Sequence, residues 1–228
     1  IKMKKNKKNN DKNKLFMMLY VVLSCIFMAF IELIIEPNYL IKSIIKIIMF
    51  FGIPFIITRL LKINILNNFK INKKEIIKLF KMGIVIYLVG FILYLILKNV
   101  FDFSEIVHSL MVDQQVTKKQ LIFVAIYLSF GNSLLEEFMF RLISFIKLKE
   151  YCSRNFAYIF SSIMFSLYHI AMISIGFPLP LTFLSLIGLF ILGILFNWLD
   201  EKDNNIYNSW FVHMFCDFLI MTIGFIHM

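Results

Sequence analysis

The sequence predicts an all-α fold, a polytopic membrane bundle of about seven transmembrane helices with a polar cavity among the last four. Hydrophobic residues make up 60% of the 228-residue chain and charged residues 17%, against about 45–50% and about 25% in soluble globular proteins. The mean hydropathy is +0.81. A soluble protein of this size could not bury so many apolar side chains, so lipid must surround most of the chain.

Seven apolar runs are candidate spans. The third is the shortest, and the others approach or exceed the length of about 20 residues that crosses a bilayer as a helix. The predicted spans are Leu15–Ile35, Leu40–Leu61, Met82–Leu97, Leu121–Ile146, Phe156–Ile175, Leu181–Leu199 and Tyr207–Phe225.

The chain begins with a strongly basic arm, residues 1–14. Seven lysines and one aspartate precede the first span and supply more than half of the formal net charge of +10. Such a segment beside a transmembrane helix is typical of a cytoplasmic anchor that faces anionic lipid. Nucleic-acid binding would need a folded soluble face to carry the charge, and the sequence shows none. We therefore expect membrane lipid as a partner, and no nucleic acid.

The charges of the loops predict the orientation in the membrane. If the N-terminus is cytoplasmic, the basic stretches after span two and between spans four and five are cytoplasmic as well. The opposite loops, Glu36–Tyr39 and Gly176–Pro180, hold no Lys or Arg. This asymmetry follows the positive-inside rule. We expect an integral protein of a bacterial cell membrane, and the sequence indicates no particular oligomeric state.

Two segments between the spans divide the chain further. The basic segment 68–81 carries apolar residues on one helical face, which predicts a helix lying along the cytoplasmic interface. The stretch Phe101–Lys119 is predicted to be the only sizeable outer loop. We therefore distinguish an N-terminal set of spans, residues 15–119, from a membrane core, residues 120–228.

Ionisable residues inside spans cost about 2.5–3.5 kcal/mol each on insertion scales and call for a partner or a function. Glu32 and Lys46 in the first two spans are expected to reach the nearby bilayer surface with their long side chains. The other intramembrane ionisable residues are concentrated in spans four, five and seven: Glu136, Glu137, Arg141, His169, His213 and Asp217.

Depth in the bilayer brings four of these residues together. At 1.5 Å per helical residue, Glu136, His169, His213 and Asp217 share one layer near the midplane. Two histidines and a carboxylate in a cavity of low dielectric constant are the parts of a zinc-type metal site with a base to activate water. We therefore expect a divalent metal ion, zinc in type, bound by His169 and His213.

Helical phase separates the two adjacent acids of span four. Glu137 and Arg141 are four residues apart, face the same way and can form an ion pair that stabilises the helix end. Glu136 lies about 100° around the helix from Glu137 and is left for another role.

Three motifs occur in order, each in its own span: Glu136-Glu137-x-x-x-Arg141, Phe165-x-x-x-His169 and His213-x-x-x-Asp217. Together they resemble the motifs of the CPBP intramembrane proteases. That family joins the type II CAAX-prenyl endopeptidases with bacterial bacteriocin-processing and self-immunity proteins, and is also called the Abi family. The resemblance covers about residues 120–226, whereas the first three spans agree in hydropathy only.

The resemblance implies a catalytic role for each motif. Glu136 resembles the glutamate that activates water in the family, and Glu137 with Arg141 completes that motif. His169 and His213 resemble the two essential histidines, proposed in the family to be metal ligands or transition-state donors.

Asp217 departs from the family pattern, which often has Asn at this position. A neutral Asn donates a hydrogen bond to an oxyanion, whereas an ionised Asp cannot. Asp217 is thus a metal ligand, a residue that orients His213, or a protonated donor.

These observations predict an intramembrane metal-dependent endopeptidase that cleaves a membrane-associated peptide or protein, of the CAAX type or of the bacteriocin or signal-peptide type. Other intramembrane proteases are not supported, because the sequence lacks both His-Glu-x-x-His and Gly-x-Ser-x-Gly. The alternative functions are a non-catalytic bacteriocin-immunity or scaffold protein and a small transporter that uses the same polar layer.

Overall fold

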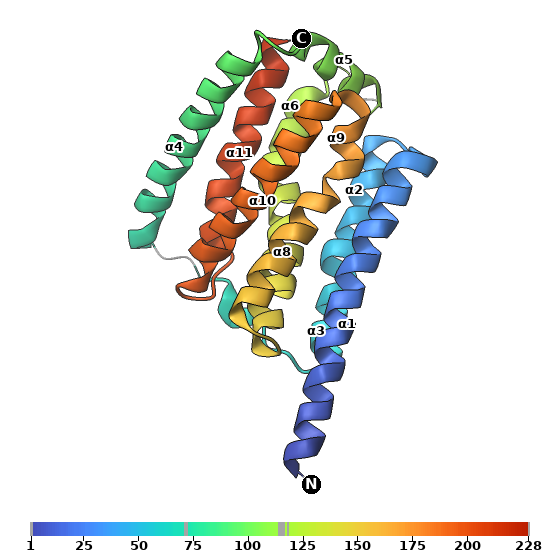
Figure 1. Ribbon diagram of the computed structural model, residues 1–228, viewed down its shortest axis with the longest axis vertical. Coiled ribbons are helices and arrows are strands. Elements are labelled where there is room, and N and C mark those ends of the chain that lie inside the picture. The colour runs from blue at the N-terminus through green and yellow to red at the C-terminus, as the bar shows by residue number, and fades with distance from the viewer. Residues whose placement is uncertain (1, 71–72, 114–116, 118, 228) are drawn as a thin grey trace.

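In the computed structural model the chain forms a bundle of long helices (Figure 1). The structure describes residues 2–70, 73–113, 117 and 119–227. Within these residues all regular secondary structure is helical, and seven helices are long and apolar enough to span a membrane. This confirms the predicted all-α fold with about seven membrane-spanning helices. The observed spans are Asn10–Ile35, Tyr39–Leu60, Glu75–Leu97, Leu121–Glu150, Arg154–Gly176, Leu179–Glu201 and Tyr207–Ile226.

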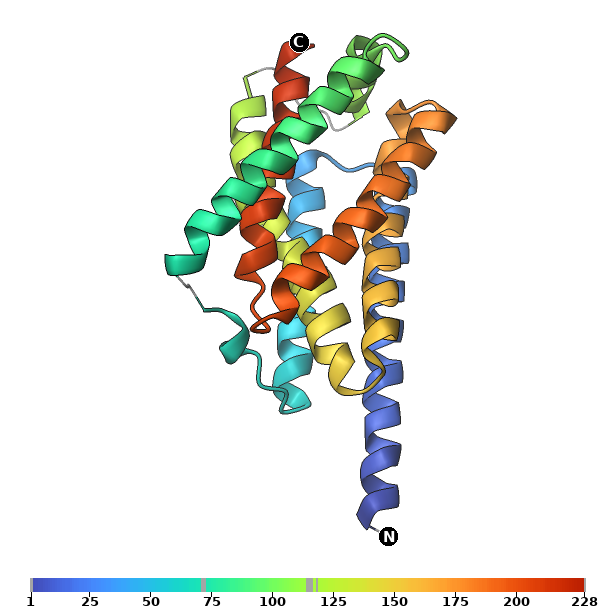
Figure 2. The same cartoon turned by 60° about the vertical axis from the view of Figure 1, so that its left-hand side comes forward.

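The first span continues the basic arm as one helix. Helix α1 covers Lys2–Phe30 and ends in the π-helical turn η1, Ile31–Ile35. Its N-terminal turns project beyond the rest of the bundle (Figure 2). The side chains before residue 10 and all of residue 1 lie outside the described part, so the contact of the arm with lipid stays a prediction.

The second span runs back along the bundle. It consists of α2 (Tyr39–Ile47), η2 (Ile48–Gly52) and α3 (Ile53–Leu60). Asn38 begins α2, because its side-chain oxygen accepts a hydrogen bond from the Ile41 amide at 3.1 Å.

The third span starts earlier than predicted. Helix α4 covers Lys73–Leu97 without a break, preceded by a short 3₁₀ turn, η3 (Leu66–Asn68). Residues 73–81 are therefore the first turns of a spanning helix, and no separate interfacial helix forms in the described part of 68–81. Residues 71–72 of that segment lie outside it. The apolar positions of 73–81 continue directly into the apolar run of the span, so one helix accommodates both.

The predicted outer loop contains a helix of its own. Helix α5, Phe103–Asp113, lies at the end of the bundle opposite the start of α1 and contacts α9 (Ile170–Gly176) (Figure 1). Residues 114–116 and 118 of the predicted loop are outside the described residues.

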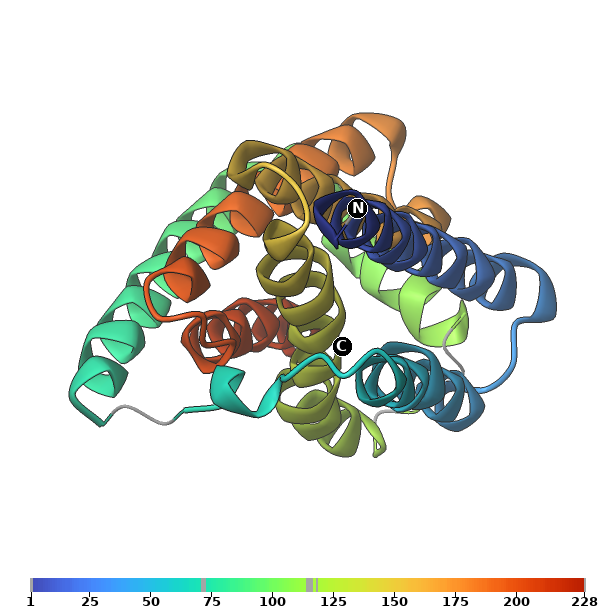
Figure 3. The same cartoon turned by 90° about the horizontal axis from the view of Figure 1, so that it is seen from below.

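The fourth span forms the centre of the molecule. It alternates α-helical and π-helical segments, and all eleven residues of its π-helical part Glu137–Lys147 are buried. Seen from the end at which α1 starts, this span crosses the middle of the bundle (Figure 3). Its segments are α6 (Leu121–Ile126), η4 (Tyr127–Asn132), α7 (Ser133–Glu136), η5 (Glu137–Lys147) and η6 (Leu148–Glu150).

The last three spans pack around this centre. Span five is interrupted after α8 (Arg154–Tyr168), and α9 follows it. The remaining two spans are α10 (Leu179–Glu201) and α11 (Tyr207–Ile226). Helix α10 packs on α8, and α11 packs along α4 (Figures 1 and 2).

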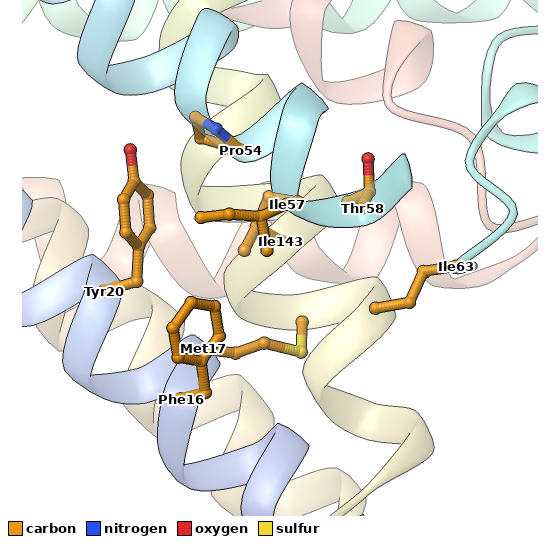
Figure 4. Close-up of a pocket in the computed structure, with 8 residues that line it drawn as sticks. All are labelled: Phe16, Met17, Tyr20, Pro54, Ile57, Thr58, Ile63 and Ile143. Atoms are coloured by element: carbon orange, nitrogen blue, oxygen red, sulfur yellow. The ribbon is translucent and has the colours of Figure 1, made fainter. Parts of the chain in front are cut away.

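Apolar side chains cover the outside of the bundle. Large hydrophobic residues such as Leu23, Ile92 and Ile191 are at least 57% exposed, as expected where lipid is the solvent. A small apolar pocket lies between the first two spans and η5, lined by Phe16, Tyr20, Pro54 and Ile143 among others (Figure 4). Its lining includes none of the predicted site residues.

Candidate active site

The structure brings together residues from three spans that are distant in sequence. The Oε2 atom of Glu136, at the end of α7, lies 3.5 Å from Nε2 of His169 and 3.7 Å from Nε2 of His213. His169 occupies the break between α8 and α9, and His213 lies on α11. The single layer predicted from helix depths is therefore a compact cluster in the structure.

The two oxygens of the Glu136 carboxylate have different surroundings. Oε1 accepts hydrogen bonds from Nζ of Lys46 at 2.6 Å and from Nδ2 of Asn132 at 3.0 Å. Oε2 has no hydrogen-bond partner among the described residues and faces the two imidazoles. One oxygen is thus held in place and the other is left to act on a third group.

The backbone fixes the ring of His169. Its Nδ1 lies 2.7 Å from the carbonyl oxygen of Phe165, and a carbonyl only accepts, so Nδ1 carries the proton. The helix breaks after Tyr168, where α8 ends. The remaining ring nitrogen, Nε2, faces Glu136.

A carboxylate performs the same task for His213. Oε1 of Glu137 lies 2.6 Å from Nδ1 of His213, which leaves Nε2 directed towards Glu136. The ring also stacks on Phe196, with centroids 5.2 Å apart. Both histidines therefore present Nε2 to the same carboxylate oxygen.

Glu137 is the centre of a second, fully buried polar network. Its Oε2 lies 3.2 Å from Nε of Arg141 and accepts a hydrogen bond from the Ser209 hydroxyl at 2.5 Å. The Asp200 carboxylate also lies 2.8 Å from that hydroxyl. The Arg141 guanidinium packs over the rings of Phe165 and Phe196, 4.0 and 4.9 Å from their centroids. The predicted Glu137–Arg141 pair is present, but it also orients a site histidine.

Two expectations from the sequence differ from the structure. Lys46 does not reach the bilayer surface: it is 6% exposed and turns inward to Glu136. Glu32 likewise pairs with the buried Lys42 at 3.1 Å. An ion pair inside the bundle leaves neither charge unpaired in an apolar surrounding. This gain outweighs the gain from extending a long side chain to water at the bilayer surface.

Asp217 is near the cluster but outside hydrogen-bond distance of it. Its Oδ1 lies 3.9 Å from Nε2 of His213, and its buried Oδ2 has no hydrogen-bond partner in the described part of the chain. Glu137, not Asp217, therefore binds and orients His213 in this structure.

Four polar partners of the site were missed by sequence reasoning. The positions of Lys46 and Asp200 could have indicated a polar partner, because each is a charged residue within or at the end of an apolar helix. Asn132 lies one turn before Glu136, and its spacing could also have indicated a contact. Ser209 carried no signal beyond its place in the last span.

The arrangement does not fit the predicted zinc-type ion. His169, His213 and Glu136 have suitable donor atoms, but no three His, Cys, Asp or Glu side chains in the described ranges are placed to hold a metal. Moreover, the Lys46 ammonium already neutralises the acid that would complete the site. No step of the proposed reaction uses a metal, and elemental analysis of the purified protein tests the expected ion.

The seven apolar helices are the features of an integral membrane protein, and the buried Glu–His cluster is its candidate site. Residues 118–219 match the family model of Rce1-like type II CAAX prenyl endopeptidases. This match agrees with the resemblance of residues 120–226 to the CPBP intramembrane proteases. The family supports an intramembrane endopeptidase of the CAAX type. No curated protein and no solved structure matches the chain.

Proposed function

We propose that the chain hydrolyses a peptide bond of a membrane-associated substrate and that Glu136 activates the attacking water. The observation that carries this proposal is the Oε2 atom of Glu136, buried, without a hydrogen-bond partner in the described chain and facing two imidazole nitrogens. A carboxylate oxygen so placed can accept the proton of a water molecule bound beside the scissile carbonyl.

The chain's own side chains account for each proton. Glu136 takes a proton from water as the water oxygen bonds to the carbonyl carbon. His213, with the negative charge of Glu137 at Nδ1, is suited to carry a positive charge and to donate from Nε2 to the developing oxyanion. His169 supports the same oxyanion when protonated at Nε2. Glu136 then passes its proton to the leaving amine as the C–N bond breaks.

The substrate class follows from the family. The matched family is named for CAAX prenyl endopeptidases, so we propose a peptide that ends in a prenylated cysteine and three further residues. A prenyl group suits a site enclosed by a lipid-facing bundle, because lipid and apolar helix surfaces both solvate it. A leader peptide of a bacteriocin or of a secreted signal is the second substrate class to assay.

Glu136→Gln tests the function directly. The variant keeps the shape and the acceptor oxygen of the side chain but cannot take a proton, so we expect a folded protein with cleavage reduced about 10²–10⁴-fold. The assay uses an internally quenched, farnesylated peptide in detergent or liposomes. Glu150→Gln is the matched control, because Glu150 ends the same span and pairs with Lys147 outside the cluster. Wild-type rates in Glu136→Gln would disprove the proposal.

A binding protein is the alternative. If the chain protects cells against a bacteriocin, and protection survives both Glu136→Gln and His169→Ala, the polar cluster serves structure and binding instead of hydrolysis. Loss of protection in both variants would favour the catalytic role.

A further inference from the structure

We propose that Lys46 is a positioning residue of the reaction: its ammonium holds Glu136 so that Oε2, and not Oε1, acts as the base. The inference rests on the proposed function of Glu136. It adds a residue from the second span, which lies outside the part of the chain that matches the family, residues 118–219.

The first evidence is the contact itself. Nζ of Lys46 lies 2.6 Å from Oε1 of Glu136, and both side chains are buried. Nζ also donates to Oδ1 of Asn132, whose Nδ2 donates to the same Oε1. Lys46, Asn132 and Glu136 thus close a three-membered ring of hydrogen bonds, which fixes the carboxylate in one rotation.

The second evidence is the way in which Lys46 is held. Its ammonium lies over the ring of Tyr168, 4.8 Å from the centroid, and near the ring of Phe50, at 5.4 Å. Aromatic faces attract a cation and leave it little freedom in an apolar surrounding. Tyr168 directly precedes His169, so the same turn holds both the ammonium and one site histidine.

The consequence is a carboxylate with one occupied and one available oxygen. Without Lys46, Oε1 of Glu136 would keep only the Asn132 amide as a donor among the described residues, and the carboxylate would be free to turn. Lys46 therefore keeps Oε2 of the base aimed at the two imidazoles.

Helix α2 supplies a matched control. Lys42 lies one turn before Lys46, is equally buried at 6% exposure, and pairs with Glu32 at 3.1 Å. Both lysines form a buried pair with a glutamate, but the Lys46 pair alone includes a residue of the proposed reaction. Loss of either pair affects folding, whereas loss of the Lys46 pair should also affect the chemical step.

The test compares Lys46→Met, Lys46→Arg and Lys42→Met in the farnesylated-peptide assay. We expect Lys46→Met to lower kcat about 10²–10⁴-fold, the range for a lost general base, with KM unchanged. Lys46→Arg should recover part of that loss because it restores the charge. Lys42→Met should keep the wild-type kcat in the folded fraction. A wild-type kcat in Lys46→Met, or an equal loss in Lys42→Met, would overturn the inference.

A stability measurement covers the case in which Lys46→Met folds poorly. The thermal midpoints of Lys46→Met, Glu136→Gln and the double variant form a cycle. The double variant should be more stable than Lys46→Met alone, because no unpaired carboxylate is left. Additive losses would contradict the pairing. Activity in Glu136→Gln would overturn the proposed function, whereas inactive Glu136→Gln with active Lys46→Met would overturn only the role of Lys46.

Discussion

Glu137 makes a buried ion pair and also contacts a histidine of the proposed site. It balances the charge of Arg141, which is fully buried, and it holds the Nδ1 atom of His213. Ser209 links it to Asp200. Because the residue makes all these contacts at once, a single substitution cannot separate the two roles.

The double variant Glu137→Leu/Arg141→Leu separates them. Replacing a buried ion pair by apolar residues is often neutral for stability, whereas Glu137→Leu alone should cost about 3–5 kcal/mol because Arg141 is left unpaired. We expect the double variant to fold and yet to lose about 10–100-fold in activity, since His213 loses its orienting partner. Thermal unfolding and peptide cleavage measure the two effects. Full activity in the double variant would mean that Glu137 is purely structural.

The Lys46–Glu136 pair also leads to a prediction about metals. With an ammonium on Glu136 and no three-donor group in the described residues, the purified protein should carry far less than one divalent metal ion per chain. Elemental analysis of wild type and of His169→Ala/His213→Ala checks this. About one zinc-like ion per chain, lost in the double variant, would restore the metal site expected from the sequence.

At the scale of helices, two glycines lie at close contacts between neighbouring helices. A Cβ atom on Gly193 of α10 would lie 2.9 Å from the Cα of Ser162 on α8. On α4, a Cβ at Gly83 would lie 2.2 Å from the ring of Phe215 on α11. Backbone cannot move aside as a side chain can, so the α8–α10 contact is the more demanding of the two.

Gly193→Ala should therefore destabilise the protein. The added methyl forces α8 and α10 apart, at a cost of about 1–3 kcal/mol. Gly188→Ala on the same helix is the matched control, because a Cβ there meets nothing within 4 Å. Gly188→Ala should leave the free energy of unfolding unchanged or raise it by up to about 1 kcal/mol, because Ala has a higher helix propensity than Gly. Thermal unfolding in detergent measures both, and equal stabilities would disprove the close approach.

At the scale of the whole molecule, the two ends of the bundle differ in charge. The connections at the end where α1 starts are rich in Lys and Arg (Figure 1). The connection at Glu36–Tyr39 and the one at Gly176–Pro180, both at the opposite end, hold none. With seven spans, α1 begins at one end and α11 finishes at the other, as the figure shows.

This asymmetry predicts a cytoplasmic N-terminus, which cysteine labelling can test. In a variant without native cysteines, Asn67→Cys should react with a membrane-impermeant maleimide only after permeabilisation, and Val100→Cys should react in intact cells. Both positions are exposed. Native Cys152 is a poor reporter, because burial raises the pKa of its thiol. The reverse labelling pattern would reverse the assigned orientation.

The sequence alone determined the features that depend on local composition. Apolar runs about as long as the membrane is thick predicted the seven spans. A segment in lipid must pair its backbone hydrogen-bonding groups internally, and a helix does so. Helical rise and phase predicted one depth for Glu136, His169, His213 and Asp217, since both follow from the regular geometry of a helix. In the structure Oε2 of Glu136 lies within 3.7 Å of Nε2 of both histidines.

The tertiary structure determined which spans lie side by side and which polar side chains contact one another. Which span lies beside which cannot be read from hydropathy, because every lipid-exposed helix has the same apolar surface. The turn of Lys46 from the bilayer surface to Glu136, and the use of Glu137 instead of Asp217 to hold His213, both depend on how spans two, four and seven meet. In a bilayer a buried charge takes its nearest opposite charge, and only the packed bundle shows which one that is.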